Sequence, residues 1–204
     1  MFALFGRAAA QEPSGLAAAL ALEEATVAAV EKAEPSVVAV ARARKGLGPR
    51  LLDPEFIPSE FASGVIVDRN GLILTVYHAL GDPEANDYAV WIDRRGYRAV
   101  IKAADPTFDL AVLQIEADSL TPIALGDATR LKKGQFVIAL GNPLAIARDG
   151  RPSASWGIIA NLHRKAAPQT DAATGLEERD TLHHYGTLIQ TDVRLERGGS
   201  GGAL

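Results

Sequence analysis

The chain has 204 residues, a formal net charge of −4, 48% apolar residues and no cysteine. This length suits one domain of about 150–250 residues or two small barrels packed together, and the apolar content excludes disorder over the whole chain. The lack of cysteine excludes disulfides and thiolate zinc sites. No basic stripe and no apolar run of about 18 residues is present, so we expect no nucleic-acid partner and no membrane span.

The first residues have an ambiguous pattern. Residues 1–10, followed by Gln11, resemble the end of an export signal with an alanine-rich cleavage site. Their apolar stretch is shorter than usual, and Arg7 interrupts it. We favour a frayed start over the remnant of a signal.

Residues 1–34 are predicted to form an N-terminal segment that contains one amphipathic helix over residues 14–33. Ser14 can cap its start and Pro35 ends it. The apolar positions near helical spacing are Leu16, Leu20, Val27 and Val30.

From Ser36 the pattern changes to short, β-branched runs. Residues 36–42 and 110–115 predict strands. Residues 45–60 contain two glycines and three prolines without a clean period, which favours a loop. We place the first β-barrel over residues 35–118.

Two hairpins are predicted within this barrel. In residues 63–75, two β-branched runs flank Asn70-Gly71, which supplies the positive φ angles of a tight turn. In the second hairpin, residues 88–92 and 97–102 are the strands, and residues 93–96 are the turn.

The second half begins after a polar link over residues 116–122. Its predicted strands are residues 135–140, 154–160 and 187–191, and the polar residues 165–180 predict a surface loop. We place a second β-barrel over residues 119–204, incomplete at its C-terminus. Many short strands without βαβ alternation or a glycine-rich phosphate loop favour an all-β barrel or sandwich over a nucleotide-binding fold.

A serine lies between paired glycines in Gly198-Gly199-Ser200-Gly201-Gly202. A serine hydroxyl is a weak nucleophile until an imidazole takes its proton, and backbone N–H groups must stabilise the oxyanion that forms. Glycines beside the serine permit the backbone angles that this arrangement needs. The alternative interpretation is a flexible linker or an artificial tail.

His78 and Asp109 are the candidate partners of this serine. His78 follows a predicted strand, whose end would place it at a cleft, although a lone histidine is commonly structural. Asp109 precedes the strand of residues 110–115; Asp105 is its rival, and either could be a turn aspartate. The chain order histidine, aspartate, serine is that of the chymotrypsin-type triad, so the three signals are stronger together than apart.

The other histidines are His163, His183 and His184. The last two form a pair in a predicted loop, but no third ligand stands at useful spacing. We interpret all three as structural or surface residues and expect no metal and no cofactor.

Several segments, taken in order, resemble the trypsin-like serine proteases of the HtrA/Deg family. They run from about Pro35 to the end of the chain, and their combination is specific although no single piece is. The matching segments are residues 63–67, 71–75 with His78, 105–115, 124–127 with Leu131, Lys133 and Gly134, 139–143, 156–159, and 189–192 leading to 198–204.

The resemblance implies an all-β, chymotrypsin/trypsin-like double β-barrel with the active site between the barrels. It makes His78 the general base, Asp109 its orienting acid and Ser200 the nucleophile, with the N–H groups of Gly198 and Ser200 as the oxyanion hole. It also implies an ATP-independent serine endopeptidase of protein quality control, acting on unfolded or misfolded proteins. Such enzymes usually work in the bacterial cell envelope or periplasm, often as homotrimers with C-terminal PDZ domains.

The chain departs from the family pattern in three ways. Gly199 stands where the family usually has a larger residue, often asparagine, and Arg194, Glu196 and Arg197 make the approach to Ser200 more charged. The strands that complete the second barrel in the family do not follow Ser200. We expect the 204 residues alone to be a C-terminally truncated protease, marginally folded, prone to aggregate, and weakly active or inactive.

Two alternatives to an active protease fit the same residues. A catalytically impaired relative would bind peptides or act as a scaffold, with Gly199 marking a relaxed oxyanion loop. A β-barrel ending in an artificial linker would have no activated serine. A fluorophosphonate probe separates these functions from a protease, because labelling of Ser200 requires an activated serine.

Overall fold

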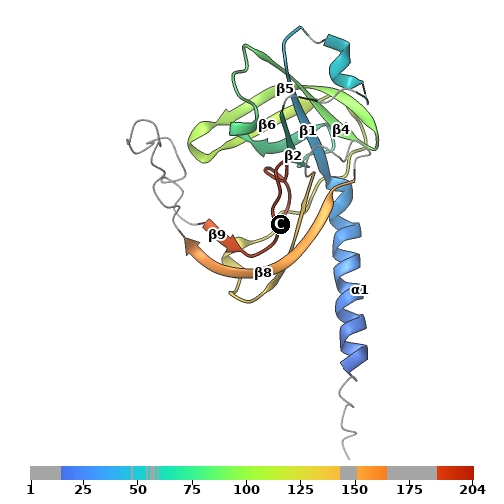
Figure 1. Cartoon of the computed structure of the whole chain (residues 1–204), viewed down its shortest axis with the longest axis vertical. Helices are drawn as coiled ribbons and strands as arrows, with labels where there is room; N and C mark the ends of the chain where they lie inside the picture. The colour runs from blue at the N-terminus through green and yellow to red at the C-terminus, as the bar shows by residue number, and fades with distance from the viewer. Residues whose placement is uncertain are drawn as a thin grey trace, which may run out of the picture.

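The computed structural model of the chain describes residues 15–46, 48–53, 55, 58, 60–142, 151–164 and 188–204. Within these residues the protein has one N-terminal α-helix, a closed six-stranded barrel and a separate three-stranded sheet (Figure 1). The predicted all-β class, with an N-terminal helix and an incomplete second barrel, is confirmed. In this part of the chain no helix is both long enough and apolar enough to cross a membrane.

The N-terminal helix α1 (Gly15–Ala33) extends away from the strands (Figure 1). It ends where the sequence predicts, because Pro35 belongs to the short 3-10 turn Glu34–Ser36 that follows. The predicted cap, Ser14, lies outside the described residues. No residue of the helix is buried, and Leu16 remains 71% exposed. The apolar stripe is therefore largely unpacked against the rest of the chain.

The closed barrel has the strand order β1-β2-β3-β6-β5-β4. Its strands are β1 (Val37–Arg44), β2 (Glu60–Ile66), β3 (Leu72–Val76), β4 (Asn86–Ile92), β5 (Arg95–Asp105) and β6 (Leu110–Ile115). All neighbours are antiparallel, and β1 closes the barrel by pairing with β4 as well as β2. Alternate side chains fill the interior. The largest buried side chains of these strands include Val38, Ile66, Ile73, Val90, Leu113 and Ile115, none more than 2% exposed.

The first predicted hairpin is confirmed, and its glycine has a clear role. β2 and β3 pair at Val65 with Leu74 and at Ile66 with Ile73. Gly71 has φ +96°, and a Cβ atom there would lie 2.2 Å from the carbonyl oxygen of Ile115. Only glycine satisfies both the left-handed backbone and the close approach.

The predicted turn of the second hairpin, residues 93–96, is wrong by two residues. Ile92 pairs with Arg95, so only Asp93 and Arg94 form the turn, with φ 45° and 64°. Two-residue turns of this kind need positive φ at both positions. Gly96 suggests a longer turn in sequence, but it lies in β5 opposite Trp91, whose ring approaches within 3.0 Å of the place a Cβ would take.

The segment predicted as a loop over residues 45–60 contains the 3-10 turn η2 (Gly48–Leu52). Within η2, Leu51 is 2% exposed and packs with Trp91 and Ala43 in a small second cluster outside the main core. Part of this loop therefore covers the outer face of the barrel.

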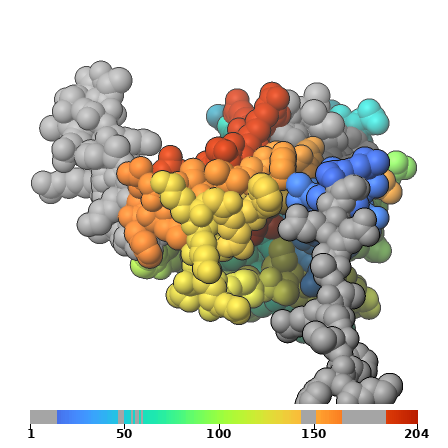
Figure 2. Space-filling model, turned by 90° about the horizontal axis from the view of Figure 1, so that it is seen from below, coloured from blue at the N-terminus to red at the C-terminus, as the bar shows by residue number. Residues whose placement is uncertain are grey.

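The second sheet has the order β7-β8-β9, with β7 (Phe136–Gly141), β8 (Ser153–Arg164) and β9 (Leu188–Thr191). β8 is longer at both ends than the predicted residues 154–160, and the predicted loop 165–180 lies outside the described residues. Seen from below, the yellow and orange segments that contain β7 and β8 lie beside the blue helix α1 (Figure 2). The three strands do not close into a barrel.

The last residues of the chain return to this sheet. Leu140 of β7 and Ala203 exchange two backbone hydrogen bonds of 2.9 Å. On the other side, the Ser63 N–H of β2 donates to the Ser200 carbonyl at 2.8 Å. Residues 196–202, hereafter the Ser200 loop, are therefore held between the closed barrel and the second sheet.

Candidate active site

The structure brings His78 and Asp109 together through strand pairing. His78 lies in the 3-10 turn η3 (Tyr77–Ala79) just after β3, and Asp109 lies just before β6. The antiparallel β3–β6 pair ends at Val76 opposite Leu110, so the two flanking residues leave the barrel side by side. The expectation that both residues lie at strand ends holds.

One carboxylate contacts His78 through both of its oxygens. Asp109 Oδ2 lies 2.7 Å from His78 Nδ1, and Asp109 Oδ1 accepts from the His78 backbone N–H at 2.8 Å. An ionised carboxylate only accepts hydrogen bonds, so this contact favours the tautomer with the proton on Nδ1 and leaves Nε2 as an acceptor. The Asp109 side chain is 26% exposed, while the His78 ring is 61% exposed and reachable from solvent.

Asp105, the rival acid, has a different task. Its Oδ1 accepts from the backbone N–H groups of Thr107 at 3.0 Å and Phe108 at 3.3 Å, so it caps the 3-10 turn η4 (Pro106–Phe108). This is the turn role that the sequence leaves open for either aspartate. Asp109 itself adopts a left-handed backbone with φ 52°, which helps to direct its carboxylate toward His78.

The Ser200 loop has an ordered backbone built on two glycines. Gly198 has φ +97° and Gly201 has φ +84°. A Cβ at Gly198 would lie 2.5 Å from the Asn142 carbonyl oxygen, and one at Gly201 would lie 2.3 Å from the Ser63 carbonyl oxygen. Both positions therefore require glycine for backbone angle and for space. A free linker makes no such contacts, so the packing disfavours the linker interpretation.

The N–H groups of this loop divide into two sets. Gly199 N–H donates to the Glu196 carbonyl at 2.9 Å, and Gly202 N–H donates to the Gly199 carbonyl at 3.0 Å. The N–H groups of Gly198 and Ser200 donate to no acceptor in the described residues. The serine's own N–H and that of the residue two positions before it are thus available to a ligand. Within the same residues, no hydrogen bond joins the Ser200 hydroxyl to the His78 ring.

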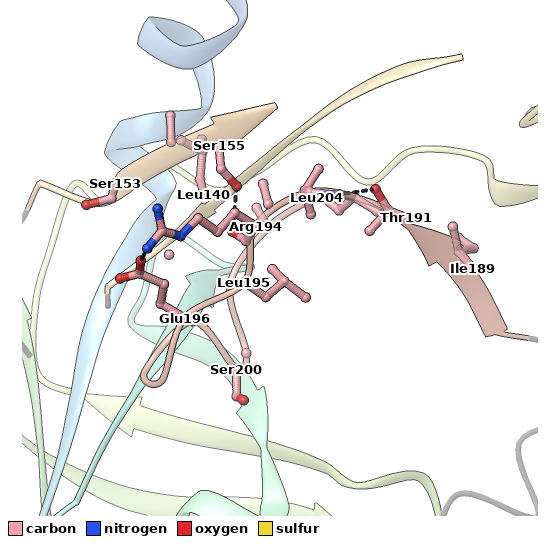
Figure 3. A pocket seen from close by; sticks show the side chains of 18 residues that line it. Leu140, Ser153, Ser155, Ile189, Thr191, Arg194, Leu195, Glu196, Ser200 and Leu204 are labelled. Carbon is pink, nitrogen blue, oxygen red and sulfur yellow. Dashed lines mark hydrogen bonds and ion pairs between the residues drawn. The ribbon is translucent and has the colours of Figure 1, made fainter. Parts of the chain in front are cut away.

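A cavity of about 580 Å³ adjoins Ser200. Figure 3 shows Ser200 at its border, with Leu195, Leu204 and Ile189 among the labelled side chains. These three apolar side chains remain 69%, 57% and 39% exposed. The cavity therefore offers unpartnered apolar surface beside the serine.

Charged residues surround the approach to Ser200, as the sequence suggests, and the structure pairs them. Arg194 and Glu196 form an ion pair of 2.8 Å at the cavity (Figure 3). Glu60 of β2 lies 3.4 Å from Arg197 and 3.8 Å from Arg42. The Arg194 and Arg197 side chains are 83% and 71% exposed, so the ion pairs that they form contribute little to stability.

The remaining histidines form no ligand cluster that the structure describes. His163 lies in β8, whereas His183 and His184 fall outside the described residues. Among the residues that are described, no group of three or more histidine, aspartate or glutamate side chains is arranged to hold a metal ion.

The sequence reasoning missed a buried polar cluster beneath the Ser200 loop. Ser63, Thr75 and Asn142 are 0%, 2% and 2% exposed. A signal exists, because Ser63 and Thr75 are polar residues with apolar residues around them in their strands, and buried polar groups need hydrogen-bond partners. The prediction that Ser63 and Thr75 lie in strands explains their backbone conformation, but it does not predict what their buried side chains bind.

The fold and these sites define a known class. Residues 62–204 match the trypsin-like peptidase domain family. The chain belongs to the trypsin-like serine proteases of the HtrA type, as its resemblance predicts.

Curated relatives are about one-third identical to this chain over the aligned residues. Serine protease HTR4 of Bos taurus is 33% identical over 179 residues, which are 86% of this chain and 33% of that protein. The mitochondrial serine protease HTRA2 of Drosophila erecta is 34% identical over 149 residues, 72% of this chain and 32% of that protein. The chain thus spans about a third of the length of the curated relatives it matches.

Solved structures show the same fold. The crystal structure of Deg5 matches with a TM-score of 0.64 and 26% identity over 89% of this chain and 78% of that one. An HtrA-type protease solved with a tripeptide matches with a TM-score of 0.65 and 27% identity, over 86% of this chain and 48% of that one.

Proposed function

We propose that the chain carries the catalytic machinery of a serine endopeptidase that hydrolyses peptide bonds of unfolded or misfolded proteins. Ser200 is the nucleophile, His78 the general base, and Asp109 the acid that orients it. The N–H groups of Gly198 and Ser200 form the oxyanion hole. The observation that carries the proposal is the 2.7 Å contact between His78 Nδ1 and Asp109 Oδ2, in a family of serine proteases.

The reaction follows from these roles. Ser200 Oγ attacks the scissile carbonyl carbon while His78 Nε2 takes the hydroxyl proton, and the oxyanion accepts from the N–H groups of Gly198 and Ser200. The intermediate then collapses: the C–N bond breaks, the imidazolium donates its proton to the leaving amine, and an ester to Ser200 remains. Water, deprotonated by His78, attacks this ester; the C–O bond to Ser200 then breaks, the imidazolium returns its proton to Ser200 Oγ, and the carboxylic acid product leaves.

Asp109 supports both halves of this cycle without changing its own protonation. Its carboxylate keeps the His78 proton on Nδ1 and stabilises the positive ring that forms when Nε2 accepts a second proton. The missing hydrogen bond between Ser200 and His78 is compatible with this role, because such contacts commonly tighten only when substrate binds.

The substrate class is supported by the surface beside Ser200. An unfolded protein differs from a folded one in presenting apolar side chains on a flexible backbone. The cavity at Ser200 exposes Leu195, Leu204 and Ile189, which suit such side chains. Envelope location and homotrimeric assembly stay predictions of the family resemblance.

The test is degradation of unfolded casein by the full-length gene product that contains this chain. We expect casein to be cleaved, and expect Ser200→Ala to abolish cleavage without changing the circular dichroism spectrum. Cleavage that survives in Ser200→Ala would overturn the proposal. Binding of casein without cleavage in both proteins would instead support the impaired, peptide-binding relative.

A further inference from the structure

Ser63 occupies an unusual place in β2. Toward its C-terminal end β2 pairs with β3 at Val65 and Ile66, but before that point the two strands separate. There the Ser200 loop, in place of β3, binds the edge of β2, since the Ser63 N–H donates to the Ser200 carbonyl at 2.8 Å. The side chain of Ser63 is also fully buried, at 0% exposure.

Ser63 makes four hydrogen bonds that are not part of the strand pairing of β2 with β1 or β3. Its Oγ donates to the Gly198 carbonyl at 2.7 Å and accepts from the Asn142 N–H at 2.7 Å. Its carbonyl accepts from Thr75 Oγ1 at 2.7 Å, and its N–H donates to the Ser200 carbonyl. The hydroxyl thus uses its donor and one acceptor position, both inside the protein.

These bonds fix the peptide groups on both sides of the serine. The Gly198 carbonyl belongs to the peptide between residues 198 and 199, and the Ser200 carbonyl to the peptide between residues 200 and 201. The peptide between them carries the Ser200 N–H. Glycines restrict backbone rotation least, so the loop's own sequence does not hold these planes. Ser63 supplies the restraint from the rigid barrel.

The same residue connects the loop to the two neighbouring parts of the site. Asn142 directly follows β7, and Thr75 lies in β3 three residues before His78. The buried Ser63 therefore links the Ser200 loop, the second sheet and the strand β3, which leads to His78. Buried hydrogen bonds of this kind are stiff, because breaking one leaves an unsatisfied group without water.

We propose that Ser63 is a positioning residue, which holds the peptide groups around Ser200 in the orientation that directs the Gly198 and Ser200 N–H groups at the oxyanion. The inference rests on the proposed protease function for its catalytic consequence. Its structural consequence, an ordered Ser200 loop, stands independently.

The first experiment is hydrogen exchange of the segment 196–204, followed by mass spectrometry in the full-length gene product. We expect Ser63→Ala to speed exchange there by about ten-fold or more, since the hydroxyl that anchors the Gly198 carbonyl is gone. Ser36→Ala is the matched control: Ser36 is also a buried serine, at 1% exposure, and it lies in the 3-10 turn Glu34–Ser36 that precedes β1. Equal exchange in Ser63→Ala and wild type overturns the inference, whether or not the protein is a protease.

The second experiment separates positioning from general stability. At a temperature where circular dichroism shows Ser63→Ala fully folded, we expect kcat to fall by about ten- to hundred-fold, with KM within about two-fold and an unchanged pH profile. The pH profile reports the His78–Asp109 pair, which Ser63 does not touch. A kcat within two-fold of wild type, despite a lower melting temperature, assigns Ser63 a merely structural role and overturns the inference.

A gentler variant covers the case in which Ser63→Ala does not fold. Thr75→Val keeps the shape of Thr75 but deletes the hydrogen bond to the Ser63 carbonyl, and Thr75→Ser keeps that bond. We expect faster exchange in segment 196–204 for the valine variant only. If the proposed function fails, the wild-type protein does not cleave casein, and this result is separate from the exchange measurement. Unchanged exchange in Thr75→Val would contradict the role of Ser63 in holding the Ser200 loop.

Discussion

At the residue scale, both oxygens of the Asp109 carboxylate bind His78, one at the ring and one at the backbone. This double contact fixes the ring in position as well as its tautomer. The sequence favours Asp109 from its position before a strand, but it leaves Asp105 as a rival. Only the structure shows that Asp105 is already engaged by two backbone N–H groups.

This contact predicts the effect of removing one charge. In Asp109→Asn, the amide can donate to the ring and favour the wrong tautomer, so we expect kcat to fall by about 10⁴. Asp105→Asn is the matched control, because asparagine caps turns as well as aspartate does. Steady-state kinetics on a peptide substrate measures both variants; a comparable loss in Asp105→Asn would contradict the assignment.

The glycines of the Ser200 loop give a prediction about stability. Gly201→Ala forces a left-handed backbone on alanine and places its Cβ 2.3 Å from the Ser63 carbonyl oxygen. We expect a loss of about 2–4 kcal/mol in the free energy of unfolding. Gly46→Ala shares the positive φ, +97°, but meets no atom within 4 Å, so it should lose only about 1 kcal/mol. Denaturant titration compares the two, and equal losses would show that space at Gly201 is not limiting.

At the element scale, much of the strand content follows from sequence because short runs of apolar and β-branched residues mark the strands. The strand over residues 110–115 agrees with β6 at both ends. The predicted turn at residues 93–96 does not agree with the structure, because two different causes can favour glycine at position 96. Turn geometry is one, and close packing against Trp91 is the other. Local sequence cannot distinguish them, because the second depends on a neighbouring strand.

The same limit explains what the sequence misses in the candidate site. The roles of His78 and Asp109 depend on strand ends, which a local pattern indicates. The role of Ser63 depends on the Ser200 loop, 137 positions further along the chain. The hydrogen bond from Ser63 Oγ to the Gly198 carbonyl joins residues 135 positions apart, and no local pattern encodes it.

The corrected turn predicts a stabilising substitution. Arg94 holds φ 64°, a backbone region that costs a non-glycine residue about 1 kcal/mol. Arg94→Gly relieves this strain at the second turn position, where glycine is favoured, so we expect about 0.5–1 kcal/mol of added stability. Arg95→Gly is the control, because Arg95 lies in β5 and glycine weakens a strand. Chemical unfolding that shows no gain for Arg94→Gly contradicts the turn assignment.

At the scale of the whole molecule, the closed barrel carries a buried phenol that couples stability to alkaline pH. Tyr88 is 6% exposed, and its hydroxyl donates to the Leu80 carbonyl at 2.9 Å. Burial raises the pKa of Tyr88 above its ordinary value of 10.0; Asp82 adds to the rise, and Arg42 opposes it. The folded state therefore holds this proton more tightly than the unfolded state does.

The sign of the effect follows from proton linkage. The contribution of Tyr88 is fully present below the unfolded pKa of 10.0 and is lost as the pH rises above it. We expect wild type to lose more stability than Tyr88→Phe between about pH 8 and about pH 11, because the other tyrosines titrate in both proteins. Urea unfolding at each pH measures this, and parallel curves would contradict the buried phenol as the cause.

The central claim is that His78 and Asp109 activate Ser200. The most direct measurement is reaction of the full-length gene product with a fluorophosphonate, followed by tandem mass spectrometry of the adduct. The account predicts one adduct per chain, located on Ser200, that forms much more slowly in Asp109→Asn and not at all in Ser200→Ala. No adduct on Ser200 of a folded protein would contradict it and would leave a protease-like protein that binds peptides without cleaving them.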